Sequence, residues 1–460
     1  PARFVQPSPP DPGPGPPRPD PRGGEGIDVT KGQSMSDGDA ALIEADPASG
    51  RTPAAGESGT TAARPRSSRL AVALMTPWDQ QCGNAEYAKR LAVGLERFAD
   101  VLPFDMQNFI DGDRRISAGE MNRYFADLIG RVNRSRADVV HIQHEFCFFA
   151  RRIGPSNHRF ADVCRRIDKP LVVSLHTWLK SMTRNQRNRP TSQFFEAVLH
   201  RLRNRHISDA LHRADAIVLH SKDTHKYFVE TFPKLKKRVT VVPIPIERVA
   251  SDHVNPAFVK RPRETWVMIP GFVSRYKGHG HLLNAFKHLP DSYKLVVAGG
   301  IHPKDKTGND YWMDLIQQAD VWGLQSRILF TGFLGDPAEQ AAVLSQADIF
   351  VLPYDEVGQS GSAVLADALS YDKPVITSRA RSMFVYRMEK QTAFSSIAVD
   401  VGDAEAFAKT IKECVRAEEK YHPDAQSHRD AARATYSLDR TQAAYERVYR
   451  SVLTGAARAA

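Results

Sequence analysis

The chain has 460 residues and 42% of them are hydrophobic, which is enough to form the cores of two domains. No stretch reaches the roughly 20 consecutive apolar residues of a membrane-spanning helix, and the first residues lack the basic start and apolar core of a signal peptide. The net charge of +10 suits anionic ligands or surfaces, but no zinc-finger spacing or RNA-binding motif accompanies it. Nucleic acid is therefore not expected as a partner.

Residues 1–67 are predicted to be a disordered tail that takes no part in the chemistry. Ten of the first 21 residues are proline, which disfavours regular structure, and residues 40–66 are mostly Ala, Gly, Ser and Thr. Met35 lies inside this tail, and we hypothesise that it is the native start, which the intact mass of the protein from its native host would test.

Residues 68–250 alternate short apolar runs with helix-length segments, a pattern typical of parallel βαβ units. One helix is expected at about 85–98. The expected strands are 70–75, 138–142, 171–175, 216–219 and 239–242. Residues 251–264, near several prolines and polar residues, are predicted to be a linker.

Residues 265–435 repeat the alternating pattern, with helices near 280–288 and 338–345. The expected strands are 266–269, 294–298, 327–331, 348–352 and 374–377. Two such series joined by a linker predict two doubly wound domains and not one large sheet. Residues 436–460 are predicted to form a C-terminal helix, at about 438–453, and a tail.

The strongest local motif lies in residues 353–377, which read PYDEVGQSGSAVLADALSYDKPVIT. A strand leads into a loop of small residues, and a helix begins near Ala363. Gly361 lets the backbone approach a ligand, and the free amides at the helix N-terminus suit a pyrophosphate. Asp367, one turn into the helix, can accept hydrogen bonds from ribose hydroxyls. An ordinary capped strand-to-helix turn explains this pattern about equally well.

A second motif, PGFVSRYKG at residues 270–278, follows the first strand of the second series. Ligands of open α/β sheets bind at the carboxyl ends of such strands. Arg275 and Lys277 are placed to neutralise the charge of a departing phosphate. The alternative is a solvated basic turn.

Polar residues also follow strands in the N-terminal half. Residues 81–85 read QCGNA, another strand-to-helix turn, while HIQHE at 141–145 and LHT at 175–177 lie at strand ends. Three histidines and a carboxylate at one sheet edge indicate a site. No pair has the spacing of a zinc site, and the four cysteines are widely spaced, so we expect no metal, no disulfide and a cytoplasmic location.

These motifs make residues 70–449 resemble the family 4 retaining glycosyltransferases of the GT-B fold. The resemblance is to a branch with the motifs CGxAxY, DVVHIQHEF, LHT and PYxxxxQSGSxxLADAL. It implies an α/β protein with two Rossmann-like, doubly wound domains that face each other across a cleft. Residues 68–250 would form an acceptor-binding lobe and residues 265–435 a donor-binding lobe, with the C-terminal helix crossing back to the N-terminal lobe.

The resemblance also implies roles for individual residues. The predicted catalytic residues are His176, Lys277 and Gln359. His176 would contact and orient the donor sugar, and Lys277 would bind the donor pyrophosphate. The remaining donor-binding residues would be Gly83, Arg275, Gly361, Ser362, Ala363 and Asp367. His144 and Glu145 are predicted on the acceptor side.

Two positions depart from the family pattern. The usual pair of glutamates, eight positions apart, is here Gln359 and Asp367, and Gln359 can bond sugar hydroxyls but cannot be a carboxylate nucleophile. Phe272 stands where the family has a phosphate-binding arginine, five residues before Lys277. Arg275 would have to compensate from a different position.

The predicted function is a metal-independent, cofactor-free, retaining hexosyltransferase that uses a UDP- or GDP-sugar and a glycan, lipid-linked or natural-product acceptor. The leaving diphosphate would take the acceptor's proton during same-face attack, so the protein supplies positioning and electrostatic stabilisation. The alternatives are a nucleotide-sugar epimerase or hydrolase on the same fold, and a non-catalytic nucleotide-sugar-binding protein.

Two other segments have ordinary explanations. The triplet DGD at 111–113 resembles the metal-binding carboxylates of the other glycosyltransferase fold, but it is interpreted as solvated surface. Between Lys180 and His206 there are seven Lys and Arg residues and one acidic residue, beside apolar residues at helical spacing. We favour an ordinary amphipathic helix there, and a peripheral contact with the inner membrane face stays open.

Overall fold

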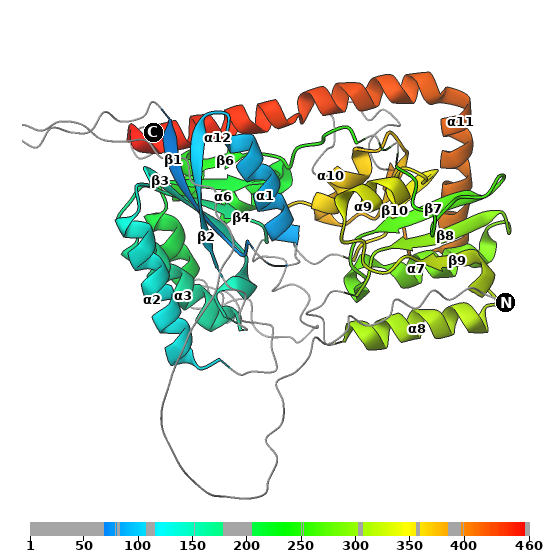
Figure 1. The fold of residues 1–460 in the computed structure, drawn as a ribbon, viewed down its shortest axis with the longest axis horizontal. Helices are drawn as coiled ribbons and strands as arrows, with labels where there is room; N and C mark the ends of the chain where they lie inside the picture. Colours follow the sequence, from blue (N-terminus) through cyan, green and yellow to red (C-terminus); the bar gives the residue numbers. More distant parts are fainter. Residues whose placement is uncertain are drawn as a thin grey trace, which may run out of the picture. The chain divides into compact units, whose positions relative to one another are not determined.

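The computed structural model describes residues 69–78, 80, 83–106, 116–150, 152–177, 205–249, 251, 253–301, 307–355, 359–384, 397–398 and 400–455. The predicted tail, Cys82, the DGD triplet and residues 180–204 of the basic segment lie outside these ranges. The described residues form an α/β protein with two six-stranded sheets, in which every strand pair is parallel (Figure 1).

The first sheet has the strand order β2-β1-β3-β4-β5-β6. Its strands are β1 (Leu70–Thr76), β2 (Ala99–Asp105), β3 (Val139–His144), β4 (Leu171–Leu175), β5 (Ala216–Leu219) and β6 (Val239–Val241). The chain reverses its direction of travel across the sheet between β1 and β3. Such a switch point leaves a crevice at the carboxyl ends of the two strands, where ligands of this fold class bind.

The second sheet has the strand order β12-β11-β10-β7-β8-β9. Its strands are β7 (Thr265–Pro270), β8 (Tyr293–Ala298), β9 (Ile328–Phe330), β10 (Ile349–Leu352), β11 (Val375–Thr377) and β12 (Ile397–Ala398). This is the Rossmann order, 3-2-1-4-5-6 when counted from β7, and its switch point lies between β7 and β10.

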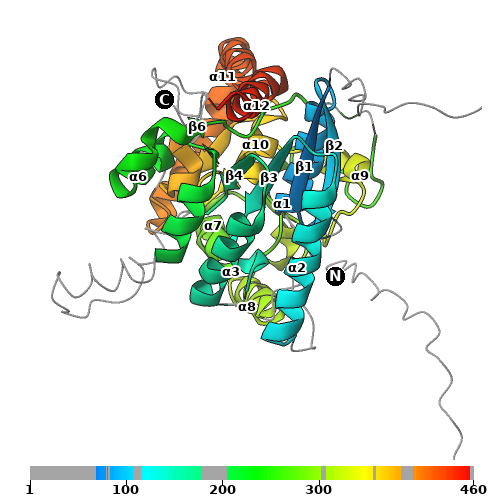
Figure 2. The same ribbon diagram turned by 90° about the vertical axis from the view of Figure 1, so that its left-hand side faces the viewer.

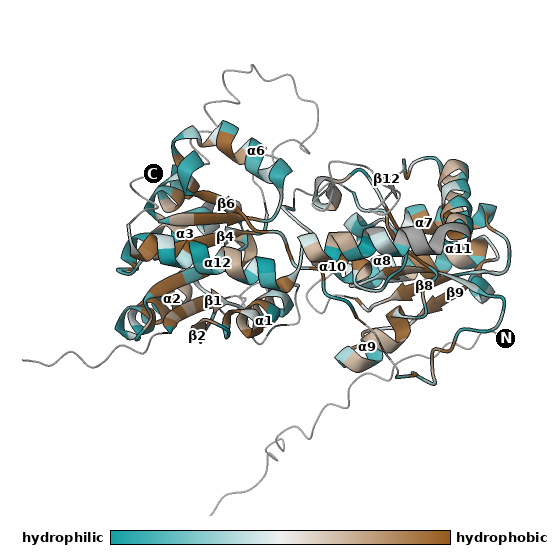
Figure 3. Cartoon of the chain, turned by 90° about the horizontal axis from the view of Figure 1, so that it is seen from above, coloured by the Kyte–Doolittle hydropathy of each residue, from teal (hydrophilic) through white to brown (hydrophobic). Residues whose placement is uncertain are grey.

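Helices cover both faces of each sheet, because alternate strand residues point to opposite faces and both sets are apolar (Figures 1 and 3). The helices are α1 (Gly83–Leu95), α2 (Ala118–Arg134), α3 (Ile153–Arg166), α6 (Lys222–Thr231), α7 (His279–Ala285), α8 (Gly308–Val321), α9 (Pro337–Leu344), α10 (Ala363–Leu369), α11 (Ala404–Thr435) and α12 (Leu438–Leu453). The 3-10 turns are η1 (Phe146–Phe148), η2 (Pro233–Arg238), η3 (Arg275–Lys277), η4 (Phe286–His288), η5 (Gln325–Arg327) and η6 (Arg381–Phe384).

In the first sheet, α2 and α3 bury their apolar sides with one face, while α1 and α12 share a core with the other (Figure 2). In the second sheet, α9 and α10 pack on one face, and α7, α8 and α11 on the other. Local signals fix several helix starts. Ser117 and Glu120 form a reciprocal capping box before α2, and Ser437 caps α12.

The predicted α/β class with two parallel, doubly wound sheets is confirmed, as are all ten predicted strands, each to within two residues of its expected ends. The strand β2 was not predicted, because Pro103 lies in its middle. Among the described strands it pairs only with β1, at the edge of the sheet, and an edge tolerates a residue without an N–H group. Within the described ranges, no helix is both long and apolar enough to cross a membrane.

Candidate functional site

Two loops come together at the switch point of the second sheet, one after β7 and one after β10. Gly278 has a left-handed backbone with φ of 73°, and a Cβ atom there would lie 2.0 Å from the carbonyl oxygen of Pro353. The amide of Asp355 donates to the carbonyl of Tyr276 at 2.7 Å. The two loops therefore pack backbone against backbone, which requires glycine at position 278 and fixes the loop that carries Lys277.

Lys277 is buried by this loop, with only 4% of its surface exposed. Its Nζ lies against Gly271, 2.6 Å from the position that a Cβ would occupy there, and 5.7 Å from the ring centre of Tyr354. Burial lowers the pKa of Lys277 to about 7, and the negative charge of Asp367 acts in the opposite direction. Within the described residues the amine makes no hydrogen bond or ion pair, an arrangement that suits an anionic ligand.

The start of α10 lies beside this lysine. Val364 would be 3.2 Å from a Cβ on Gly271, the same glycine that contacts the Lys277 amine. The hydroxyl of Ser362 accepts from the amide of Leu365 at 3.1 Å, and the amides of Ala363 and Val364 keep no partner among the described residues. The helix has only seven residues, so we attribute any attraction for an anion to these amides and not to a helix dipole.

Asp367, further along α10, pairs with Arg90 of α1 at 2.5 Å between Nη1 and Oδ1. Arg90 is a neighbour of the candidate site that the motifs in the sequence did not indicate. It lies two helical turns after Gly83 and shares a face with Tyr87, so the helical period after the small-residue turn was the available signal. Gly83 itself is exposed at the start of α1, and a Cβ there would meet nothing within 4 Å.

The carboxyl ends of β3 and β4 carry a cluster of histidines. The amide of His176 donates to the carbonyl of His144, and its Nε2 lies 2.7 Å from the Oε1 of Gln143. The His176 ring also contacts the rings of Tyr87 and His220. Burial and the neighbouring histidines lower the pKa of His176 well below its usual value, so the imidazole is neutral at physiological pH. His141 lies inside β3, not at the end where it was predicted.

The loop after β10 is joined to the end of β4. Gln359 and Thr177 form an antiparallel bridge, and the amide of Ser360 donates to the carbonyl of His176 at 2.9 Å. The Ser360 hydroxyl donates to the carbonyl of Leu175 at 2.7 Å. These contacts bring together His176 and Gln359, two of the three residues predicted to be catalytic.

The two predicted acceptor-side residues have different surroundings. The carboxylate of Glu145 accepts from the Thr177 hydroxyl at 2.5 Å and from the amide of Phe146 at 3.1 Å, and burial raises its pKa. It therefore lies beside the Gln359–Thr177 bridge. His144 is fully buried, and its neighbours are aromatic rings: Phe146, Phe149 and Phe160. This position does not support a contact between the His144 side chain and an acceptor.

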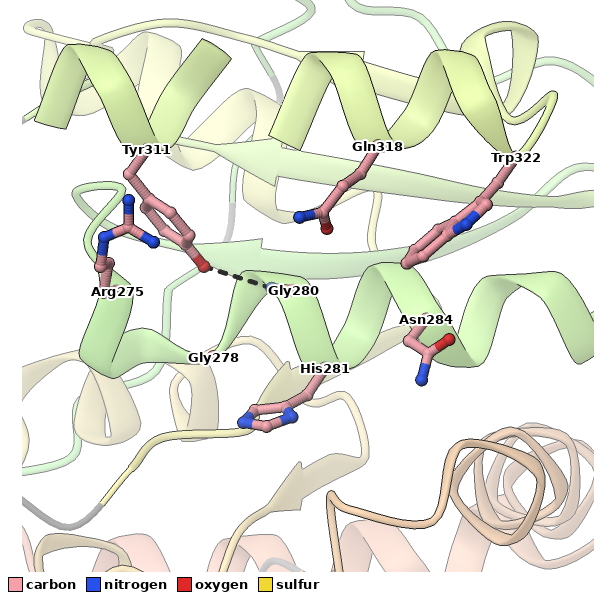
Figure 4. Close-up of a pocket in the computed structure, with 8 residues that line it drawn as sticks. All are labelled: Arg275, Gly278, Gly280, His281, Asn284, Tyr311, Gln318 and Trp322. Carbon is pink, nitrogen blue, oxygen red and sulfur yellow. Dashed lines mark hydrogen bonds between the residues drawn. The ribbon is translucent and has the colours of Figure 1, made fainter. Parts of the chain in front are cut away.

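Arg275 does not join the Lys277 group. Its guanidinium pairs with Asp314 at 2.8 Å and lies 4.7 Å from the ring centre of Tyr311, both on α8. It lines a separate hollow of about 280 Å³ between α7 and α8 (Figure 4). The figure shows Tyr311 reaching across to the amide of Gly280, with Gln318 between the helices. The expected compensation for the missing family arginine is therefore not seen at Lys277.

Phe272, which replaces that arginine, stacks on the ring of Phe333, with 5.7 Å between centroids and an angle of 9°. An apolar pair thus occupies a position where a second cation was expected by resemblance. Within the described ranges, no group of three or more His, Cys, Asp and Glu side chains is arranged to hold a metal ion.

Two protein-family models match the chain. Residues 106–248 match the Glycosyltransferase Family 4 model, and residues 263–417 match the Glycosyl transferases group 1 model. With the two parallel sheets, these matches support a GT-B protein of the family 4 glycosyltransferase type. None of the curated protein sequences matches the chain significantly.

Solved GT-B structures are similar to this chain at low sequence identity. HepE from Anabaena, in complex with UDP and glucose, gives a TM-score of 0.60 at 16% identity over 83% of this chain and 100% of its own. Sucrose-phosphate synthase from Thermosynechococcus elongatus gives 0.64 at 16% identity over 84% and 100%. A UDP-forming trehalose-phosphate synthase from Burkholderia xenovorans gives 0.58 at 12% identity over 84% and 99%. At these identities the likeness establishes the fold.

Proposed function

We propose that the chain is a metal-independent, retaining hexosyltransferase that takes its sugar from a UDP- or GDP-sugar. The observation that carries the proposal is the buried amine of Lys277, which has no anionic partner among the described residues and lies beside the free amides of α10. A buried cation of this kind is costly unless a ligand supplies the opposite charge, and a diphosphate does so.

The other predicted residues have consistent places around such a donor. Asp367 would hold the ribose, once its contact with Arg90 is shared or exchanged. His176 and Gln359, joined through the β4 end and the loop after β10, would contact the sugar. UDP is named for two of the solved neighbours, which favours UDP over GDP as the first donor to examine.

The proposed reaction needs no protein nucleophile. The bond between the sugar's anomeric carbon and the diphosphate oxygen breaks, and the acceptor hydroxyl attacks from the same face. The acceptor's proton passes to the leaving diphosphate, whose developing charge Lys277 and the α10 amides stabilise. Gln359 carries no charge, and both carboxylate oxygens of Glu145 already accept hydrogen bonds.

Glu145 is also the observation that favours a second candidate, a nucleotide-sugar epimerase or hydrolase. It is a carboxyl group beside the Gln359–Thr177 bridge, burial raises its pKa, and carboxyl groups are common general acids and bases. The two candidates differ in their products, because an epimerase or hydrolase needs no acceptor hydroxyl other than water.

The full chain should be incubated with a panel of UDP- and GDP-sugars, in EDTA, with and without glycan, lipid-linked and natural-product acceptors. We expect acceptor-dependent release of nucleoside diphosphate and a product that keeps the donor's anomeric configuration by NMR. Free sugar or an epimer at the same rate without acceptor would favour the second candidate. No turnover of any donor that binds would favour the non-catalytic alternative.

A further inference from the structure

A chain of buried hydrogen bonds connects His176 with the last helix. The Nε2 of His176 lies 2.7 Å from the Oε1 of Gln143, and the Nε2 of Gln143 lies 3.2 Å from the Nε2 of His141. The Nδ1 of His141 lies 2.7 Å from the hydroxyl of Tyr449 on α12. His176 is half-buried, and the other three residues are buried.

The direction of each hydrogen bond in this series sets the direction of the next, because a side-chain amide donates through its nitrogen and accepts through its oxygen. The Nε2 of Gln143 donates, so the Nε2 of His141 accepts and its proton is on Nδ1, facing Tyr449. The Oε1 of Gln143 accepts, so the Nε2 of His176 carries the proton. Since His176 is neutral, its Nδ1 keeps a lone pair.

Two further observations are compatible with this polarity. The hydroxyl of Ser174 lies 2.8 Å from the same Nε2 of His141, and a serine hydroxyl can donate to that nitrogen. Burial and the nearby His220 lower the pKa of His141 to about 3, which keeps this ring neutral as well. The Nδ1 of His176 makes no hydrogen bond to any described residue.

We propose that Gln143 is a positioning residue that holds His176 as the Nε2–H tautomer, so that the Nδ1 lone pair is available to a hydroxyl of the donor sugar. Tyr449 binds the last imidazole of this hydrogen-bond series, that of His141, and so connects the C-terminal helix to the tautomer of His176. The inference rests on the proposed function for the identity of the ligand, but the tautomer is a property of the free protein.

The direct test is NMR of the full chain labelled with ¹⁵N-histidine, because a protonated and a bare ring nitrogen have very different ¹⁵N shifts. The His176 signals are assigned by their loss in His176→Ala. We expect a protonated Nε2 and a bare Nδ1 in the wild type. A protonated Nδ1 would overturn the inference, because the Gln143 amide would then be oriented the other way. This readout stands even if no nucleotide-sugar binds.

Two variants test the consequence for the sugar. Gln143→Leu removes both hydrogen bonds, so we expect mixed tautomers of His176 and a roughly 5- to 20-fold lower kcat/KM, with UDP affinity unchanged. Gln143→Glu places a carboxylate beside His176 and raises its pKa, so activity should fall near pH 6 and recover at higher pH, unlike the wild type. If both variants keep the wild-type pH profile and kcat/KM, Gln143 has only a structural role. A wild type that binds neither UDP nor GDP would refute the proposed function but not the tautomer.

Discussion

The carboxyl edges of the two sheets differ in the chemistry they present. At the second sheet the β7 and β10 loops bury a cation, Lys277, beside two amides that have no partner among the described residues. At the first sheet the ends of β3 and β4 carry the uncharged side chains of Gln143 and His176, held by hydrogen bonds, next to the carboxylate of Glu145. Both edges belong to the same kind of parallel sheet, so the fold does not determine which chemical groups each edge presents. The side chains in the loops do.

This difference suggests that the two edges bind different parts of the proposed donor. A buried cation with no anionic partner is suited to a charged group such as a diphosphate, whose charge repays the cost of burial. Neutral hydrogen-bonding groups are suited to a sugar, which is polar but uncharged. The Gln359–Thr177 bridge joins the two edges and gives a reason for both halves of one donor to bind there.

The largest effect on stability is expected from a single added methyl group at the carboxyl edge of the second sheet, beside Lys277. Gly278→Ala forces a left-handed backbone on alanine and drives its Cβ into the carbonyl of Pro353. We expect a loss of about 2–4 kcal/mol in the free energy of unfolding, together with loss of nucleotide binding. Urea denaturation of both proteins measures the difference.

Gly83→Ala is the matched control, because a Cβ at Gly83 meets nothing within 4 Å and the residue starts a helix. Its stability should stay within about 0.5 kcal/mol of the wild type. Equal losses in the two variants would show that the close packing of the β7 and β10 loops is not what makes position 278 sensitive.

A pH dependence of about 1.4 kcal/mol per pH unit is expected for diphosphate binding above pH 7. The pKa of Lys277 is lowered to about 7, so the free protein loses this proton as the pH rises, whereas a bound diphosphate favours the protonated amine. Binding should therefore take up a proton between pH 7 and 9, and the affinity should fall about tenfold per unit. The groups facing the amine are Asp367, Tyr354 and His279.

Calorimetry of UDP binding in buffers of different ionisation enthalpy measures this proton uptake. Lys277→Arg is the control, because arginine stays charged throughout this range and should show no uptake. A pH-independent affinity in the wild type would mean that the amine is already charged before the ligand arrives.

A smaller effect on stability, of opposite sign, is expected at the carboxyl edge of the first sheet. His144 is fully buried among phenylalanines, and neither ring nitrogen has a hydrogen-bond partner in the part of the chain that the structure describes. His144→Phe removes these unsatisfied groups and should stabilise the protein by about 1 kcal/mol while leaving transfer activity unchanged. Thermal unfolding and the transfer assay measure both. A large loss of activity would instead support the prediction that His144 contacts the acceptor.

The smallest effect on stability is expected from Arg90→Ala. The Arg90–Asp367 pair has side chains that are 54% and 30% exposed, and exposed pairs contribute less than about 1 kcal/mol. If Asp367 must be released for the ribose, UDP affinity should stay equal or rise slightly. A strong loss of UDP affinity would instead make Arg90 part of the donor site.

The sequence was sufficient for most of the fold because the strands are apolar on both faces and end in recognisable loops. The edge strand β2 was missed because Pro103 argues against a strand. The helix α11 was not predicted, and Pro423 within it argues against an uninterrupted helix.

The candidate site was only partly predictable from the sequence. Lys277, His176 and Gln359 were recognised because each follows a strand within a motif. Arg275 was assigned to the same group because it is two residues from Lys277, but η3 turns its side chain toward Asp314 of α8. The roles of Gln143 and Arg90 depend on partners far away in the chain, Tyr449 among them, and no local pattern indicates such contacts.

The most direct test of the division between the two edges is a thermal-shift panel of UDP, GDP, ADP and TDP with their sugar conjugates, without metal, on the wild type and Lys277→Ala. We expect UDP or GDP and its conjugates to raise the melting temperature of the wild type, by the equivalent of about 2.7 kcal/mol at a concentration one hundred times Kd, and to leave the variant unchanged. A wild type that no nucleotide stabilises, or a variant that is stabilised equally, would contradict the assignment of the diphosphate to Lys277.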